Sequence, residues 1–227
     1  MANLGCIFDW DGTIVDSGRT HEKTWIRLAE AHGLELIPDF FSITFGKRNI
    51  EIISRILKWT DDPAEIAKLS DEKERMYRAI IAERSVPPVA GVEDFLRLLN
   101  ARGALCAVGS STPRANLDAT VAKLGYGGFF RAYVASEDVS RGKPAPDVFL
   151  EAAKRLGLPP HKCAVFEDSL AGIQAGVAAG MKTVAVATTN TAEFWREASA
   201  DPASRCDLVI GDFAKVSPAD IEALFAQ

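Results

Sequence analysis

Short apolar runs bounded by polar and turn-forming residues recur along most of the chain. Runs of three to five apolar residues are too short for a helix, so they predict buried strands. The predicted strands are Leu4–Phe8, Ala104–Val108, Tyr133–Ala135, Cys163–Phe166, Thr183–Ala187 and Asp207–Ile210.

Segments with helical spacing separate these runs after residue 90. Helices are expected around Phe95–Leu99, from Pro113 towards Leu124, over Pro146–Leu156, over Ile173–Ala179, after Thr191 and after Ser217. Strands that alternate with helices of about ten residues indicate βαβ units. The fold class is therefore α/β, a Rossmann-like, doubly wound parallel sheet with helices on both faces.

Residues 17–86 have a different pattern, in which apolar positions recur at helical spacing and no strand is convincing. Trp25, Leu28 and Ala29 form one stripe, Ile50, Ile53 and Ile56 a second, and residues 66–81 one or two more. We predict an all-helical cap domain over 17–86, inserted into a core domain of residues 1–16 and 87–227. The expected hinges lie near Asp16 and Pro87.

Composition narrows the classes of function. The 227 residues are 48% hydrophobic and 25% charged, which is typical of a globular protein, and the net charge is −5. No basic run favours nucleic acid, and no apolar run approaches the ~20 residues of a membrane span. Four cysteines without a C-x-x-C pair indicate free thiols in a reducing compartment, so we expect a cytoplasmic protein, by default a monomer.

Polar residues follow several of the predicted strands. Asp9 and Asp11 follow the first, Ser110 and Ser111 the second, and the pair Glu167-Asp168 the fourth. In an open parallel sheet, ligands bind beyond the carboxyl ends of the strands, so these side chains are expected to meet.

The same group of side chains indicates a particular chemistry. Lys143 can add one ammonium group, and carboxylates are the oxygen ligands that Mg²⁺ prefers. Small hydroxyl residues before a helix offer an anion their hydroxyls and backbone N–H groups. Together these parts fit phosphoryl transfer, in which a metal ion and a lysine offset the charge of the phosphate.

These motifs resemble those of the haloacid dehalogenase superfamily, in its helical-cap phosphatase and β-phosphoglucomutase branch. The resemblance covers nearly the whole chain. Asp9-Trp10-Asp11-Gly12-Thr13 is similar to the first motif of that family, D-x-D-G-T, and Ser110 to the second. Lys143 in Gly142-Lys143-Pro144 is similar to the third motif, and Glu167-Asp168-Ser169 to the fourth.

The resemblance implies a role for each core residue. Asp9 is the nucleophile, and Asp11 the general acid that then activates water. Ser110 binds the phosphoryl group, helped by the backbone N–H of Ser111, although a shifted register would make Ser111 the main contact. Lys143 steadies the phosphoryl group. The metal ion, Mg²⁺, is bound by Asp9, the backbone carbonyl of Asp11, Glu167 and Asp168.

Further substrate contacts are expected from the cap and from one core helix. His21 and Trp25 have an H-x-x-x-W spacing that resembles the sugar-phosphate members of the branch, although a structural role for both stays open. A Gly turn followed by polar residues lies where the caps of related enzymes meet substrate. The candidate substrate-binding residues are Ser111, His21, Lys47, Arg48, Asn49 and Arg114.

We therefore predict a Mg²⁺-dependent phosphatase that acts on a small phosphorylated metabolite, a sugar phosphate, through an aspartyl-phosphate. β-Phosphoglucomutase is the alternative in the same superfamily. Phosphonoacetaldehyde hydrolase and a haloacid dehalogenase proper are disfavoured, because Asp11 and the metal-binding acids serve phosphate-ester chemistry. A non-catalytic phosphate-binding protein on the same fold is the alternative of a different class.

Overall fold

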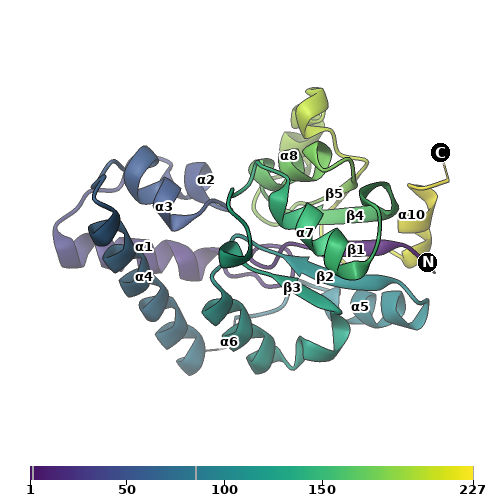
Figure 1. Cartoon of the computed structure of the whole chain (residues 1–227), viewed down its shortest axis with the longest axis horizontal. Helices are drawn as coiled ribbons and strands as arrows, with labels where there is room; N and C mark the ends of the chain where they lie inside the picture. The colour runs from purple at the N-terminus through teal and green to yellow at the C-terminus, as the bar shows by residue number, and fades with distance from the viewer. Residues whose placement is uncertain (2, 85, 227) are drawn as a thin grey trace.

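A six-stranded, fully parallel sheet forms the centre of the molecule (Figure 1). The computed structural model describes residues 1, 3–84 and 86–226. The strands lie in the order β3-β2-β1-β4-β5-β6, which confirms the predicted α/β class. Their bounds are β1 Gly5–Phe8, β2 Leu105–Gly109, β3 Ala132–Val134, β4 Cys163–Glu167, β5 Lys182–Val186 and β6 Leu208–Ile210.

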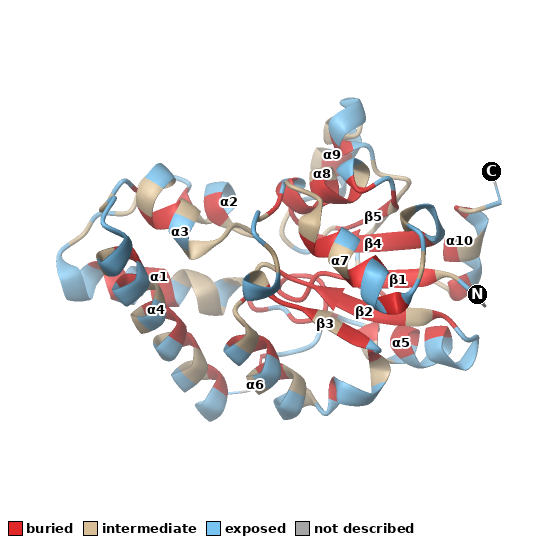
Figure 2. Cartoon of the chain, viewed as in Figure 1, coloured by how far each residue is buried: buried red, intermediate tan, exposed pale blue. Residues whose placement is uncertain are grey.

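Helices cover both faces of this sheet (Figure 1), and the strands between them are largely buried (Figure 2), except the half-buried edge strand β6. Successive side chains of a strand point to opposite faces. Cys6 and Phe8 therefore pack on the side of α5, whereas Ile7 packs on the side of α7. The helices of this part are α5 Val92–Ala101, α6 Arg114–Leu124, α7 Asp147–Leu156, α8 Leu170–Ala178, α9 Ala192–Ala198 and α10 Pro218–Ala223.

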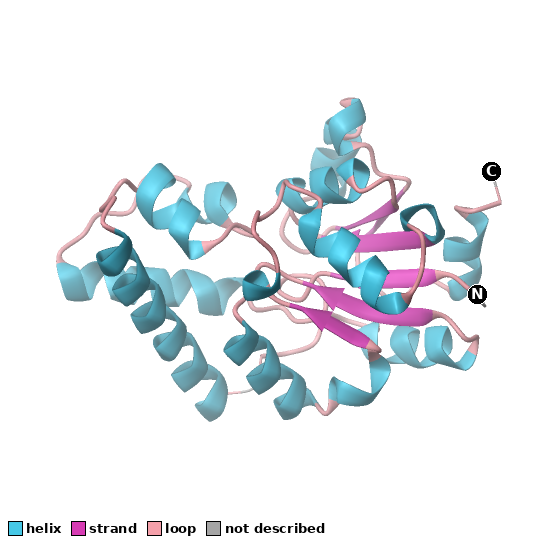
Figure 3. Ribbon diagram, viewed as in Figure 1, coloured by secondary structure: helices cyan, strands magenta, loops and turns pink. Residues whose placement is uncertain are grey.

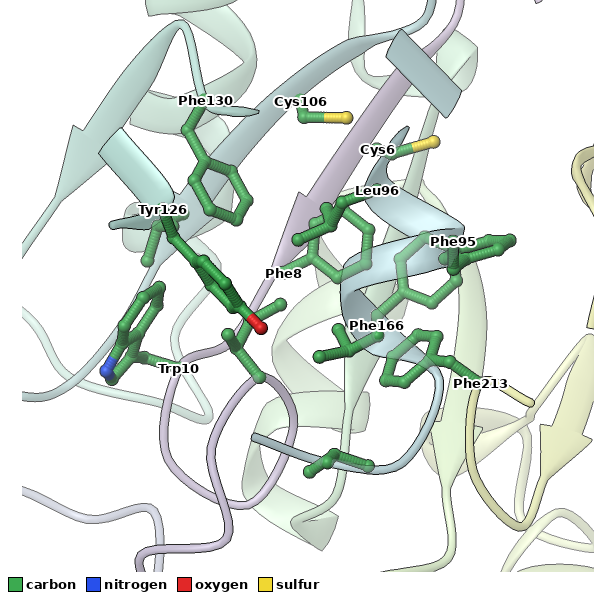
Figure 4. Close-up of a cluster of buried hydrophobic side chains, with 14 of the residues drawn as sticks. Cys6, Phe8, Trp10, Phe95, Leu96, Cys106, Tyr126, Phe130, Phe166 and Phe213 are labelled. Carbon is green, nitrogen blue, oxygen red and sulfur yellow. The ribbon is translucent and has the colours of Figure 1, made fainter. Parts of the chain in front are cut away.

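Aromatic side chains fill the core on the α5 side of the sheet (Figure 4). Phe8 stacks on Phe166 of the neighbouring strand, with ring centroids 4.4 Å apart. Phe95 of α5 covers this pair, at 5.8 Å from the ring of Phe166. The strand ends that carry Asp9 and Glu167 thus rest on a rigid, close-packed layer.

Between β1 and α5 the described residues form helices and no strand of the sheet (Figure 3). Trp25, Leu28, Ile53 and Leu69 belong to a separate apolar cluster inside this helical block. No helix of the described residues combines the length and apolar character needed to cross a membrane. The elements are α1 Gly18–His32, α2 Phe40–Thr44, α3 Asn49–Glu51, the π-helical turn η1 Ile52–Ile56, and α4 Pro63–Glu83.

The structure specifies two details of the helical block, the first of which the sequence prediction of one or two helices had left open. The apolar positions of residues 66–81 lie on a single helix, α4, which Asp62 caps by accepting a hydrogen bond from the N–H of Ala64. The stripe at residues 50–57 is divided between α3 and η1, and Ile50 is 57% exposed. A π turn has a wider repeat than an α-helix, so it rotates the stripe.

The two connections between the helical block and the sheet run side by side. The N–H of Asp16 donates to the carbonyl of Pro87 at 2.9 Å, and Val15 forms a bridge with Pro88. The predicted domain ranges, which include Ala2, Ser85 and Gln227 outside the described residues, stay a prediction. The paired segments are where two hinges would lie.

Replacing Phe95 tests whether the aromatic layer carries the stability of the sheet. Phe95→Ala should lower the free energy of unfolding by about 3–5 kcal/mol, because a buried ring is replaced by a cavity. Leu98→Ala on the same helix is the control, since Leu98 is 51% exposed and the change should stay within about 0.5 kcal/mol. Denaturant unfolding measures both, and equal losses would contradict the packing described.

Candidate active site

The acidic pair after β1 is directed to the pocket side by the residue between the two acids. Trp10 turns into the core, where its indole N–H donates to Thr120 Oγ1 at 2.8 Å. Asp9 and Asp11 both line the pocket beyond the strand ends. Gly12 follows with φ +82°, and an added Cβ there would lie 1.9 Å from Asp168 Oδ2. Glycine is therefore required here for Asp168, which follows β4, to approach the acidic pair after β1.

A buried ammonium group joins the acids of the two strands. Lys143 Nζ donates to Asp9 Oδ1 at 2.8 Å and to Glu167 Oε1 at 2.6 Å. Burial opposes the charge of Lys143, but the attraction of both carboxylates holds its pKa above the ordinary value. Burial raises the pKa of Asp9 to about 7, with Lys143 opposing and Glu167 reinforcing the shift. With Asp168, three buried acidic residues lie close together here, and Lys143 supplies one positive charge among them.

The three acids fit a divalent cation. One carboxylate oxygen from each of Asp9, Glu167 and Asp168 lies within 4.8 Å of the others, and all three residues are buried. Burial, followed by the charges of Glu167 and Asp9, raises the pKa of Asp168 well above its usual value. An oxygen-only donor set with negative charge in excess of one lysine suits a hard cation. The predicted fourth ligand, the backbone carbonyl of Asp11, stays a prediction.

The carboxylate of Asp11 is held apart from this cluster by its own set of donors. Ser17 donates to Oδ1 at 2.5 Å, His21 Nε2 lies 3.1 Å from the same oxygen and the Tyr77 hydroxyl 3.4 Å from it. Thr112 donates to Oδ2. Burial by itself would raise the pKa of Asp11, but His21 and the hydroxyl donors hold it well below its usual range.

The helical block contributes a buried polar chain behind His21. Lys73 Nζ lies 2.8 Å from His21 Nδ1 and donates to Glu74 Oε1 at 2.9 Å. An ammonium group has only donors, so Nδ1 accepts and Nε2 carries the proton that faces Asp11. The ring of Tyr77 stacks on the imidazole at 4.2 Å. Histidine is thus fixed in orientation and tautomer.

A pocket lies between these strand ends and the helical block. Ser110 is buried and lines this pocket with Asp9, and its N–H donates to the carbonyl of Val134 at 2.9 Å. The pocket combines carboxylates, hydroxyls and cations with an aromatic wall. The residues that line it include Asp9, Asp11, Ser110, Ser111 and Thr112 from the sheet part, and His21, Trp25, Phe41, Phe45, Lys47, Asn49, Lys73 and Glu74 from the helical block.

Most of the residues chosen from the sequence meet here, but two of the substrate-binding candidates lie outside the pocket. Arg114 pairs with Asp138 and donates to the carbonyl of Tyr133 at 3.0 Å. Arg48 donates to backbone carbonyls of the sheet part. Both guanidinium groups donate to acceptors in β3 or in the segment that follows it, which the spacing of the sequence does not reveal.

Several residues that shape the site were not identified from the sequence. Lys73 and Tyr77 are four residues apart on α4 and continue the stripe that begins at Leu69. The position of Lys73 in an otherwise apolar stripe was the feature of the sequence that could have indicated a buried, functional lysine. No local pattern distinguishes Ser17 or Thr189, although Thr189 donates to Asp168. The full set is Ser17, Lys73, Glu74, Tyr77, Thr112 and Thr189.

Comparison with known families agrees with this arrangement. The model of the haloacid dehalogenase-like hydrolase family matches residues 4–180. The chain therefore belongs to this family of hydrolases, which confirms the resemblance found in the four motifs.

Individual relatives place the chain in the phosphatase branch of the family. It is 37% identical over 182 residues to the fructose-1-phosphate phosphatase YqaB of Escherichia coli, covering 80% of this chain and 95% of that protein. It is 35% identical over 188 residues to a chloroplastic 5-amino-6-(5-phospho-D-ribitylamino)uracil phosphatase of Arabidopsis thaliana, covering 82% of this chain. The chain spans about half the length of that second relative.

Among solved structures, the fold is similar to that of a β-phosphoglucomutase from Clostridium difficile. The TM-score is 0.84, with 24% sequence identity, and the match covers 100% of this chain and 98% of the other. At this level of identity the similarity establishes the fold.

Titration with a divalent cation tests the acidic cluster. Mg²⁺ or Mn²⁺ at a hundred times its dissociation constant should stabilise the chain by about 2.7 kcal/mol, because the ion binds only the folded cluster. Asp168→Asn should remove most of this stabilisation by the metal ion. Asp147→Asn is the matched control, since Asp147 pairs with Arg141 outside the cluster. Thermal unfolding measures the shift, and an equal shift in both variants would contradict the assignment.

Proposed function

We propose that this chain is a Mg²⁺-dependent phosphatase that hydrolyses a sugar phosphate or a similarly small phosphorylated metabolite. The observation that carries the proposal is Asp9, which is buried, accepts a hydrogen bond from Lys143 at 2.8 Å and lines a pocket together with Asp11 and Ser110. The names of the two curated phosphatase relatives, one of which acts on a sugar phosphate, support the same class of substrate.

The proposed nucleophile is the carboxylate of Asp9, which the hydrogen bond from Lys143 holds in place. Its oxygen attacks phosphorus, the bond to the leaving oxygen breaks, and an aspartyl-phosphate forms. Lys143 offsets charge on the phosphoryl oxygens, and Ser110 donates its hydroxyl to one of them. Asp9, Glu167 and Asp168 would hold Mg²⁺, which when bound supplies further positive charge at these oxygens.

The proposed proton carrier is Asp11. It gives a proton to the leaving oxygen, then takes one from the water that cleaves the aspartyl-phosphate, so that inorganic phosphate leaves and Asp9 is restored. His21 and the hydroxyl donors favour its ionised form. Negative charge of a phosphoryl group beside Asp11 raises its pKa by like-charge repulsion, which favours the protonated form that gives its proton to the leaving oxygen.

Residues 17–86 act in this proposal as a cap that contacts the leaving group. Lys47 and Asn49 line the pocket from the loop after α2 and the start of α3. Within the described residues, the ammonium of Lys47 makes no ion pair, so it is available to an oxygen-rich leaving group.

The charge of the pocket favours hydrolysis over the mutase alternative. A mutase moves a phosphoryl group between two positions of one sugar, so it needs a second anion site. Lys73 is committed to Glu74 and His21, while Arg48 and Arg114 lie outside the pocket. Among the described lining residues, Lys47 is then the one uncommitted lysine or arginine on the cap side.

Assay of phosphate release, with Asp9→Asn as the test variant, decides between these functions. The wild-type chain should release phosphate from one or more sugar phosphates in the presence of Mg²⁺, and Asp9→Asn should release none, because an amide oxygen is a poor nucleophile. Asp16→Asn, an exposed acid of the same segment, should keep full activity. Conversion of β-glucose 1-phosphate to glucose 6-phosphate with little phosphate release would favour the mutase.

Replacement of Asp11 should separate the two proton transfers. Asp11→Asn should slow hydrolysis of sugar phosphates by about 10²–10⁴-fold, because their leaving alkoxide needs a proton. With p-nitrophenyl phosphate, whose leaving group needs none, a rapid burst of one p-nitrophenolate per enzyme should precede slow turnover. Stopped-flow absorbance measures the burst. A uniform loss for both substrates without a burst would exclude the proposed role.

A further inference from the structure

Arg48 extends from the helical block to a single loop of the sheet part. Its guanidinium donates to the carbonyls of Ser136 at 2.6 Å, Val139 at 2.8 Å and Ser140 at 3.1 Å. Its aliphatic stem packs on Gly142, where an added Cβ would lie 2.9 Å from Arg48 Cδ. Nη1 and Nη2 of this half-buried side chain therefore donate to backbone acceptors of residues 136–142, named here the β3–α7 loop, whereas Nε has no partner among the described residues.

The β3–α7 loop leads directly into Lys143. It is part of the connection between β3 and α7 and contacts the helical block through Arg48 (Figure 1). One peptide bond separates Gly142 from the lysine whose ammonium lies 2.8 Å from Asp9. Hydrogen bonds from a charged donor are about twice as strong as neutral ones. A residue of the helical block thus supports the loop that immediately precedes Lys143.

The neighbouring residue Gly46 contacts the other loop that supports the charge cluster. It has φ +82°, and an added Cβ would lie 2.7 Å from Ser169 Oγ. The N–H and the hydroxyl of Ser169 donate to Glu167 Oε2 at 2.6 and 2.9 Å. Residues 46–48 therefore touch the supports of both Lys143 and Glu167, which pair at 2.6 Å.

We propose that Arg48 is a positioning residue that holds Lys143 in place through the β3–α7 loop, and that it does not bind substrate. This inference rests on the proposed phosphatase function. Arg48 belongs to the helical block and its acceptors to the sheet part, so Lys143 is held against Asp9 only while the two parts are in contact. The arginine thereby makes phosphoryl transfer depend on the packing of the helical block.

Kinetics of Arg48→Gln distinguish positioning from substrate binding. The two test substrates are the best sugar phosphate of the assay above and acetyl phosphate, whose leaving group is too small to extend beyond the pocket. A positioning residue predicts that kcat falls by the same factor for both, roughly tenfold or more for the loss of charged hydrogen bonds, with little change in KM. A rise in KM for the sugar phosphate with acetyl phosphate unaffected would overturn the proposal.

Two further variants serve as controls. Arg48→Lys should recover part of kcat for both substrates, because an ammonium group can donate to these carbonyls but lacks the planar fork. Arg75→Gln should leave both parameters unchanged, since Arg75 is an exposed arginine of α4 whose Nε donates to the carbonyl of Asp71 in its own helix. No recovery with lysine, or an equal loss in Arg75→Gln, would contradict the assigned role.

Hydrogen exchange provides a readout that does not require activity. The N–H groups of Ser136, Asp138 and Ala145 donate to the carbonyls of Thr112, Ala135 and Gly142 at 3.1, 3.1 and 3.0 Å. Arg48→Gln should accelerate exchange at these three amides and leave the interior of α1 unchanged. If the wild-type chain hydrolyses no phosphate ester, the proposed function fails, and exchange still tests the loop contact. Unchanged exchange in the loop would overturn the inference.

Discussion

The site depends on the ammonium of Lys143, which lies between the carboxylates of Asp9 and Glu167 with almost no solvent around it. Removing one partner from such a buried group of charges costs about 3–5 kcal/mol, because a charge is left without compensation. With Asp168 included, the acids outnumber the lysine, and burial holds the pKa of Asp9 near 7. This excess of buried negative charge is what makes a divalent cation, and then a phosphoryl group, fit the same place.

Two things could be predicted from the sequence: the parallel sheet, and those residues of the site that lie at the ends of its strands. Parallel strands present their carboxyl ends at one edge, so Asp9, Ser110 and Glu167 had to meet once six short apolar runs were recognised. Lys143 could be included because its motif resembles that of the family. In each case the backbone of a strand, or a motif next to one, determines where the side chain lies.

The half of the site that the helical block carries could not be predicted in the same way. Which face of α4 meets the strand ends depends on how the helical block packs against the sheet. Many contacts between residues distant in the sequence determine this packing. Lys73 and Tyr77 were therefore not predicted as part of the site. Arg114 and Arg48 were expected at the pocket and lie outside it. Arginine has five donors and binds whichever acceptors fold beside it, so its spacing in the sequence has little predictive value.

The helical block makes separate contacts with two parts of the site, Asp11 and the charge cluster around Asp9. His21, oriented by Lys73, faces Asp11, the proton carrier of the proposed mechanism. Arg48 holds the loop before Lys143 and so acts on the charge around Asp9. Since both side chains belong to one packed block, a displacement of that block would weaken the acid–base group and the charge cluster together. A phosphatase built in this way would avoid forming the aspartyl-phosphate while its nucleophile is open to water, because neither half of the site is complete until the block is in contact.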